Sequence, residues 1–252
     1  MGTLKQKLSK TGYVNIPVEL CEYAIRNNFY RPMQLYIYLN ANCSGKLKIS
    51  NDELPNIGKA IGLNSARAVK NNLNILMDKN WIGYNKKSKI YFIRGVDKIR
   101  WLHGFKTKTA AEFDSREIKK LKAFLAAAKI GYLLDNQKRK KRATERLTGR
   151  SNHVARQSFE YYPLANLALA KVLNVSLSTA YQLKQLAHKA GYIAIKKSFV
   201  ETNLDAYQET PLKKGLPELA SKVRIKKGKI LLQGIDMVMH FLTFKKRKKL
   251  ET

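Results

Sequence analysis

Acidic residues are scarce in this chain of 252 residues. Eighteen Asp and Glu stand against 49 Lys and Arg, which leaves a formal net charge of +31 and a pI near 10.1. A compact fold bears a self-repulsion cost for such an imbalance, so a polyanionic partner is the natural explanation. Nucleic acid is the first expectation, and the alternatives are an anionic membrane surface and a lysine-rich solvated surface.

Cysteine and histidine are also few, and their spacing argues against several kinds of site. Cys21 and Cys43 lie in no CxxC or Cys/His pattern, so we expect a reducing interior, without a zinc site or a disulfide framework. The four histidines are scattered singly, and no GxxxxGK[ST] loop occurs. We therefore expect a protein that is not an enzyme, with no catalytic residue, no metal and no cofactor.

Long apolar runs are missing as well. The N-terminal stretch "MGTLKQKLSKTGYVNIP" is basic and has no apolar segment of the kind that a signal peptide needs. The longest apolar stretches are far shorter than a membrane span. We expect a cytoplasmic, nucleoid-associated protein that does not bind a membrane.

An order of elements typical of a winged helix is present, and it occurs first in residues 17–108. Helical periodicity over 17–43 precedes a short strand at 46–50, and Ser50 and Glu53 then have the spacing of a capping box. A further helix, "ARAVKNNLNILMDKN", is followed by "WIGYN" and "KIYFIRG", which read as a β-hairpin with lysines at its tip. Residues 1–16 are expected to be a basic flexible arm.

The same order returns in residues 161–252. A long helix and a basic connector are expected over 109–160, and then "PLANLALAKVL" leads into "VSLSTAYQLKQLAHKAGYI" and a strand. Three pairs of segments match in the same order, while their offset grows from about 111 to about 139 residues. The pairs are 60–64 with 172–176, 80–82 with 191–193, and 91–105 with 230–244. The growing offset predicts an insertion near 201–222 in the second wing, before a basic C-terminal tail.

The second helix of each copy has an exposed face that suits the reading of base edges. Short polar, amide and guanidinium side chains read the major groove, and hydroxyls and backbone N–H groups at a helix start hold phosphates. Hairpin lysines and a run of five cations add phosphate contacts. An ordinary solvated helix face is the alternative for either helix alone. The expected DNA-binding residues are Asn64, Ser65, Arg67, Lys70, Asn71, Asn74, Lys86, Lys87, Lys89, Lys138, Arg139, Lys140, Lys141, Arg142, Ser176, Ser178, Thr179, Tyr181, Gln182, Lys184, Gln185, Lys196 and Lys197.

The segment "LANLALAKVLNVSLSTAYQLKQLAHKAGYI" resembles the helix-turn-helix and first strand of winged-helix DNA-binding domains. Their pattern LAxxLxVSxxT, with later Leu and GYI positions, is matched by Leu169, Ala170, Leu173, Val175, Ser176, Thr179, Leu183, Gly191 and Ile193. The first copy matches less well, because Pro55 lies in its first helix and Asn80 replaces the glycine. Many regulators share this motif, so the resemblance implies DNA binding and no particular role.

Two such units in one chain resemble plasmid and phage replication initiators in architecture. The expected fold is mainly α with β-hairpin wings (α+β), arranged as two tandem winged-helix domains. The expected function is sequence-specific binding of double-stranded DNA from a plasmid, phage or mobile element, by a monomer with two modules or by a dimer. Alternatives are an excision or recombination accessory factor, a transcriptional regulator, a nucleic-acid packaging protein, and a protein that docks on an acidic replication or recombination partner.

Overall fold

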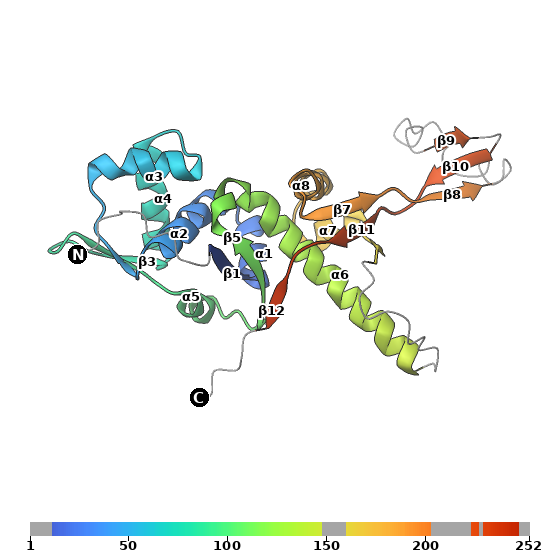
Figure 1. The fold of residues 1–252 in the computed structure, drawn as a ribbon, viewed down its shortest axis with the longest axis horizontal. Coiled ribbons are helices and arrows are strands. Elements are labelled where there is room, and N and C mark those ends of the chain that lie inside the picture. Colours follow the sequence, from blue (N-terminus) through green and yellow to red (C-terminus); the bar gives the residue numbers. More distant parts are fainter. Residues whose placement is uncertain (1–11, 148–159, 203–222, 227–228, 247–252) are drawn as a thin grey trace.

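The computed structural model describes residues 12–147, 160–202, 223–226 and 229–246, and its ribbon is shown in Figure 1. These residues form helices together with four small antiparallel sheets of three strands each. The fold is therefore mixed α+β, which confirms the expected class. Among the described residues, no helix is both long and apolar enough to cross a membrane.

The first half of the chain contains two packed helices, a helix–turn–helix and a hairpin. Its elements are β1 (Tyr13–Pro17), α1 (Val18–Arg26), α2 (Tyr30–Asn42), β2 (Lys46–Leu47), a 3₁₀ turn (Asn51–Glu53), α3 (Leu54–Ile61), α4 (Ala66–Asp78), β3 (Ile82–Asn85), β4 (Ile90–Ile93) and α5 (Val96–Leu102). The predicted Ser50–Glu53 capping box is present. The strands β2, β4 and β3 form one sheet in that order, with β4 in the centre.

The second half repeats this order with one long helix and one insertion. Its elements are β5 (Thr109–Asp114), a 3₁₀ segment (Ser115–Lys120), α6 (Leu121–Leu147), β6 (Tyr162–Pro163), α7 (Asn166–Leu173), α8 (Leu177–Lys189), β7 (Ile193–Lys196), β8 (Phe199–Thr202), β9 (Val223–Lys226), β10 (Lys229–Gln233), β11 (Met237–His240) and β12 (Phe244–Lys246). The strands β6, β11 and β7 form a sheet in that order. The central strand β11 therefore corresponds to β4.

This correspondence corrects one of the three sequence matches. The alignment of 91–105 with 230–244 places β4 on β10, whereas the strand pairing places β4 on β11. The two Gly-x-Asp segments also have different structures, because Gly95 precedes helix α5 and Gly234 precedes strand β11. The similarity of these segments is therefore not a structural equivalence.

The insertion in the second wing is larger than the predicted segment 201–222. It begins at β8 and ends at β10, and its strands form a separate sheet in the order β8-β10-β9. In Figure 1 this sheet extends away from the body as a continuation of β7 and β11. Residues 203–222 lie outside the described part of the chain.

The fourth sheet joins the two halves and corrects the predicted domain boundaries. Strand β1 pairs antiparallel with β5, and β5 pairs on its other side with β12 from the end of the described chain. Residues 13–16 are therefore part of strand β1 and not of the predicted flexible arm. Residues 1–11 of that predicted arm lie outside the described part of the chain. Residues 109–147 begin the second unit and are not a connector. The leading strands β1 and β5 run in opposite directions in this sheet.

The two halves also share one hydrophobic core. Helix α6 packs against α1, α2 and α8, and the stretch Phe124–Ala128 on α6 is buried. Its small alanines let the neighbouring helices approach closely. The Arg26 guanidinium on α1 donates a 2.8 Å hydrogen bond to the carbonyl oxygen of Val172 on α7. Shared burial and a shared sheet make the two units one body.

Candidate nucleic-acid interface

The same local geometry starts helix α4 and helix α8. A residue with positive φ ends the preceding helix in each unit, Gly62 at 74° and Asn174 at 52°. A serine then caps the second helix: the Ser65 hydroxyl accepts from the backbone N–H of Ala68, and the Ser176 hydroxyl accepts from that of Thr179. Each cap satisfies one N–H at the helix start and fixes the angle between the two helices.

Helix α4 divides cleanly into a buried and an exposed side. Val69, Leu73 and Leu76 are buried in the core. The predicted residues Arg67, Asn71 and Asn74, at i, i+4 and i+7, form one exposed stripe. Asn64, Ser65 and Lys70, also predicted, are exposed around the start and flank of this helix.

Helix α8 presents an equivalent stripe at the same helical spacing. Ser178 and Gln182 are exposed, and Gln185 is half-buried on the same stripe. Tyr181 lies beside the stripe and is 49% exposed. Thr179 is half-buried on the other flank, next to its capping serine. Five of the predicted α8-unit residues are thus accessible from one side, together with the exposed cap Ser176.

Lys184 does not belong to that face, and its prediction as a surface contact is wrong. Its side chain is 1% exposed, and its ammonium donates to Asp236 Oδ2 at 2.6 Å. The position i+4 from Ala180, which is itself buried, explains this placement. Lys184 therefore ties α8 to the start of β11.

Two exposed residues extend the stripes and were not predicted. Lys189 continues the line of Ser178, Gln182 and Gln185, and Asp78 occupies the corresponding end of the α4 stripe. The repeating i, i+4, i+7, i+11 spacing would have found both from the sequence. The opposite charges of Lys189 and Asp78 make the two stripes electrostatically different.

The two wings differ in how they carry their lysines. Lys86, Lys87 and Lys89 are exposed at the tip between β3 and β4. The side chain of Asn85 holds this tip, because its Oδ1 accepts from the backbone N–H groups of Lys87 and Ser88. In the second wing Lys196 ends β7 and Lys197 follows it. They are exposed at a point where the chain continues into β8, so they do not lie at a hairpin tip.

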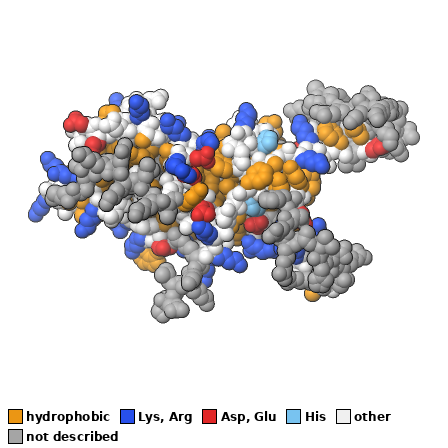
Figure 2. Space-filling view, viewed as in Figure 1, with side chains coloured by type: hydrophobic (Ala, Val, Ile, Leu, Met, Phe, Trp, Pro, Cys, Tyr) orange, Lys and Arg blue, Asp and Glu red, His pale blue; other side chains and the backbone are white. Residues whose placement is uncertain are grey.

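The predicted basic run lies on the distal part of α6. The helix continues through Lys138–Arg142, so these cations are helical. Arg139, Lys140, Lys141 and Arg142 are exposed, and Lys138 is half-buried. Figure 1 shows this end of α6 projecting beyond the packed body. Figure 2 shows many Lys and Arg side chains and few acidic ones over the described surface.

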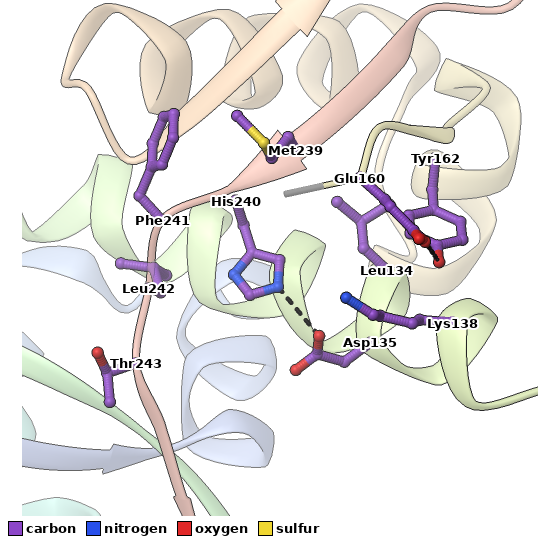
Figure 3. A pocket seen from close by; sticks show the side chains of 10 residues that line it. All are labelled: Leu134, Asp135, Lys138, Glu160, Tyr162, Met239, His240, Phe241, Leu242 and Thr243. Carbon is purple, nitrogen blue, oxygen red and sulfur yellow. Dashed lines mark hydrogen bonds and ion pairs between the residues drawn. The ribbon is translucent and has the colours of Figure 1, made fainter. Parts of the chain in front are cut away.

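A cavity of about 400 Å³ lies where α6, β6 and β11 meet, and Figure 3 shows its lining. His240 Nε2 lies 3.1 Å from Asp135 Oδ1, and the Tyr162 hydroxyl donates to Glu160. The first contact ties β11 to α6, and the Gln137 amide ties α6 to β6 because it donates to the Pro163 carbonyl oxygen at 3.3 Å. Among the described residues, no group of three or more His, Cys, Asp or Glu is placed to hold a metal ion.

Comparisons with protein-family models, with curated proteins and with solved structures found no match to this chain. The functional interpretation therefore rests on the geometry of the two units and on the charge of the chain.

Proposed function

We propose that the chain binds double-stranded DNA sequence-specifically through two winged-helix units, with α4 and α8 as recognition helices. The observation that carries this proposal is the repetition of one polar stripe in two equivalent places. Arg67, Asn71 and Asn74 on α4 match Ser178, Gln182 and Gln185 on α8, each after a serine cap. Amide and guanidinium groups on an exposed helix face suit base edges in the major groove.

The strand order supports the winged-helix interpretation of both units. In each unit the short strand before the helix–turn–helix forms one sheet with the two wing strands that follow it. The last of these strands lies in the centre of the sheet. A net charge of +31 suits a partner that carries one negative charge at every phosphate. Lysines of the first wing and cations of distal α6 are proposed to contact phosphates. The biological role proposed is that of a replication initiator-like protein of a plasmid, phage or mobile element.

The shared core gives this proposal a geometric consequence. Since α1, α6 and the sheet β1-β5-β12 fix the two units in one body, one chain should engage two elements of a site at constant spacing. The unlike stripes predict that the two elements differ in sequence.

Substitution of one stripe residue tests the proposal against non-specific packaging of nucleic acid. Gln182→Ala should cost about 1–3 kcal/mol of binding free energy on the preferred duplex and relax the preference at one position. Asn51→Ala, which removes an exposed amide from the 3₁₀ turn before α3, is the matched control and should leave the preference intact. Affinity is measured by competition against random duplex and bulk RNA as salt rises. Equal collapse of all three affinities would contradict sequence-specific reading.

Neutralisation of Lys138–Arg142 separates affinity from specificity. Replacement of these five cations by Gln should lower the slope of log affinity against log salt and leave the preferred sequence unchanged. An unchanged slope would show that distal α6 does not contact phosphates.

A further inference from the structure

One large aromatic side chain is exposed on α5, outside both proposed recognition helices. Trp101 on α5 is 72% exposed, whereas the second tryptophan of the chain, Trp81, is fully buried. In Figure 1 α5 lies at the lower edge of the body, below α4, and α8 lies at the upper edge. Helix α5 packs on the core through Ile99, whereas the Trp101 indole points to solvent. Packing of α5 therefore does not explain why a tryptophan stands at position 101.

One lysine covers this indole, and further lysines are exposed on the segment that follows α5. The Lys98 ammonium lies over the Trp101 ring, 3.9 Å from its centroid. Arg100 Nη2 donates to the carbonyl oxygen of Thr107 at 2.9 Å, which holds the segment after α5 against the helix. Lys106 and Lys108, on either side of Thr107, are both exposed.

The end of the described chain adds one more cation. Lys246 on β12 pairs in register with Thr109, next to Lys108, and it is exposed. The nearest acidic side chains already have partners: Asp97 pairs with Arg100, and Glu19 accepts from the backbone N–H of Thr107. The surface formed by Trp101, Lys98, Lys106, Lys108 and Lys246 is named the α5 surface below.

We propose that the α5 surface binds an unpaired nucleic-acid strand, with one base stacked on Trp101 and lysines on the neighbouring phosphates. Single-strand sites combine a basic track with aromatic platforms on which bases stack. The Lys98 ammonium holds the indole from one side through a cation–π contact, and the 72% exposure leaves the ring open to a base. Protein interfaces are depleted of lysine, so a lysine on the exposed ring and exposed lysines on the adjoining segment favour a polyanion over a protein.

This activity is separate from duplex reading, because it uses residues on neither stripe. The test titrates the full chain and its variants with a single-stranded oligothymidylate and, separately, with the preferred duplex. Trp101→Ala should weaken single-strand binding roughly tenfold, the value of one lost base stack. Trp101→Phe, which keeps an aromatic platform, should retain most of the affinity. Leu167→Ala, which removes another exposed apolar side chain, is the control and should change nothing.

Two further readouts decide between the possible outcomes. Tryptophan fluorescence should be quenched by the oligothymidylate in the wild type and not in Trp101→Phe, because the remaining Trp81 is buried. Lys106→Gln with Lys108→Gln should lower the salt slope of single-strand binding by about 0.7 per contact. An unchanged affinity in Trp101→Ala would overturn the proposal, as would quenching by polyglutamate as strong as that by the oligonucleotide. Binding of the duplex by Gln182→Ala tests only the proposed duplex function, because Gln182 does not belong to the α5 surface.

Discussion

The buried ion pair between Lys184 and Asp236 leads to the most specific prediction about stability. The Lys184 ammonium is 1% exposed and the Asp236 carboxylate is 13% exposed, with 2.6 Å between Nζ and Oδ2. Removal of one partner leaves the other charge buried without compensation, which costs about 3–5 kcal/mol of unfolding free energy. Lys184→Met and Asp236→Leu should therefore each destabilise the protein by about that amount.

The double variant tests the physical reason. When both charges are removed together, no uncompensated charge remains, so Lys184→Met/Asp236→Leu should regain most of the loss and lie within about 1–2 kcal/mol of the wild type. Asp236 Oδ1 also accepts from Gln233 at 3.3 Å, so a small residual loss is expected. Urea unfolding, followed by tryptophan fluorescence in the Trp101→Phe background, measures the three values through buried Trp81. Additive losses would refute the account of a charge pair.

The same variants test the correction made at α8. Because Lys184 faces Asp236 and not the solvent, the double variant should bind the preferred duplex with the affinity and sequence preference of the wild type. A selective loss of duplex binding by the folded double variant would show that Lys184 contacts DNA after all.

Three further predictions concern single side chains. Ser176→Ala removes the cap of α8 and should cost about 1 kcal/mol in urea unfolding, whereas Ser176→Asn should restore most of it. Burial lowers the pKa of His103, and its neutral Nε2 accepts a hydrogen bond from the Trp81 indole at 2.9 Å. The resulting contribution to the free energy of unfolding is present above about pH 6.5 and is lost as the pH falls through the lowered pKa. In a His103→Gln variant, the free energy of unfolding should therefore fall less steeply between pH 7.5 and 5. Gly131→Ala should destabilise the protein by about 1–3 kcal/mol, although alanine has the better helix propensity. The reason is that the new Cβ would lie 3.0 Å from His240 Cγ and from the Phe244 ring. A variant that is stabilised in thermal unfolding would contradict the close packing of α6 on β11 and β12.

Local features of this fold could be predicted from the sequence because they depend on neighbouring residues. The capping box at Ser50, the positive φ at Gly62 and the inward positions of Val69 and Leu73 follow from spacing along one helix. The interior place of Trp81 follows from its position at the base of a strand. Each of these features depends on residues that are close together in the sequence.

Long-range pairings could not be predicted in the same way. The register Tyr13↔Asp114 in β1–β5 and the addition of β12 to β5 join residues about one hundred or more positions apart, with no local sequence signal. These pairings place the start of the second unit at residue 109 instead of 161. The Gly-x-Asp similarity of 91–105 and 230–244 was misleading for the converse reason, because a short match carries no information on strand pairing.

Lys184 illustrates an intermediate case at the candidate site. Its spacing from Ala180, Leu183 and Ala187 indicates the buried side of α8, but its charge favours a surface position. Asp236, the partner that makes burial of the Lys184 charge possible, follows the inserted sheet in the sequence and is 52 residues from Lys184. The sequence between them gives no local signal of this pairing. The exposed stripe, in contrast, could be predicted because all its members lie on one helix.

Selection of bound sequences from a random duplex library tests the central claim most directly. The account predicts enrichment of two short elements that differ in sequence and keep one fixed spacing, since the units that carry α4 and α8 share one core and one sheet. Gln182→Ala should relax one element only, and Asn71→Ala the other. Recovery of unenriched sequences, or of two elements at variable spacing, would contradict the claim that one chain reads duplex DNA through two fixed recognition helices.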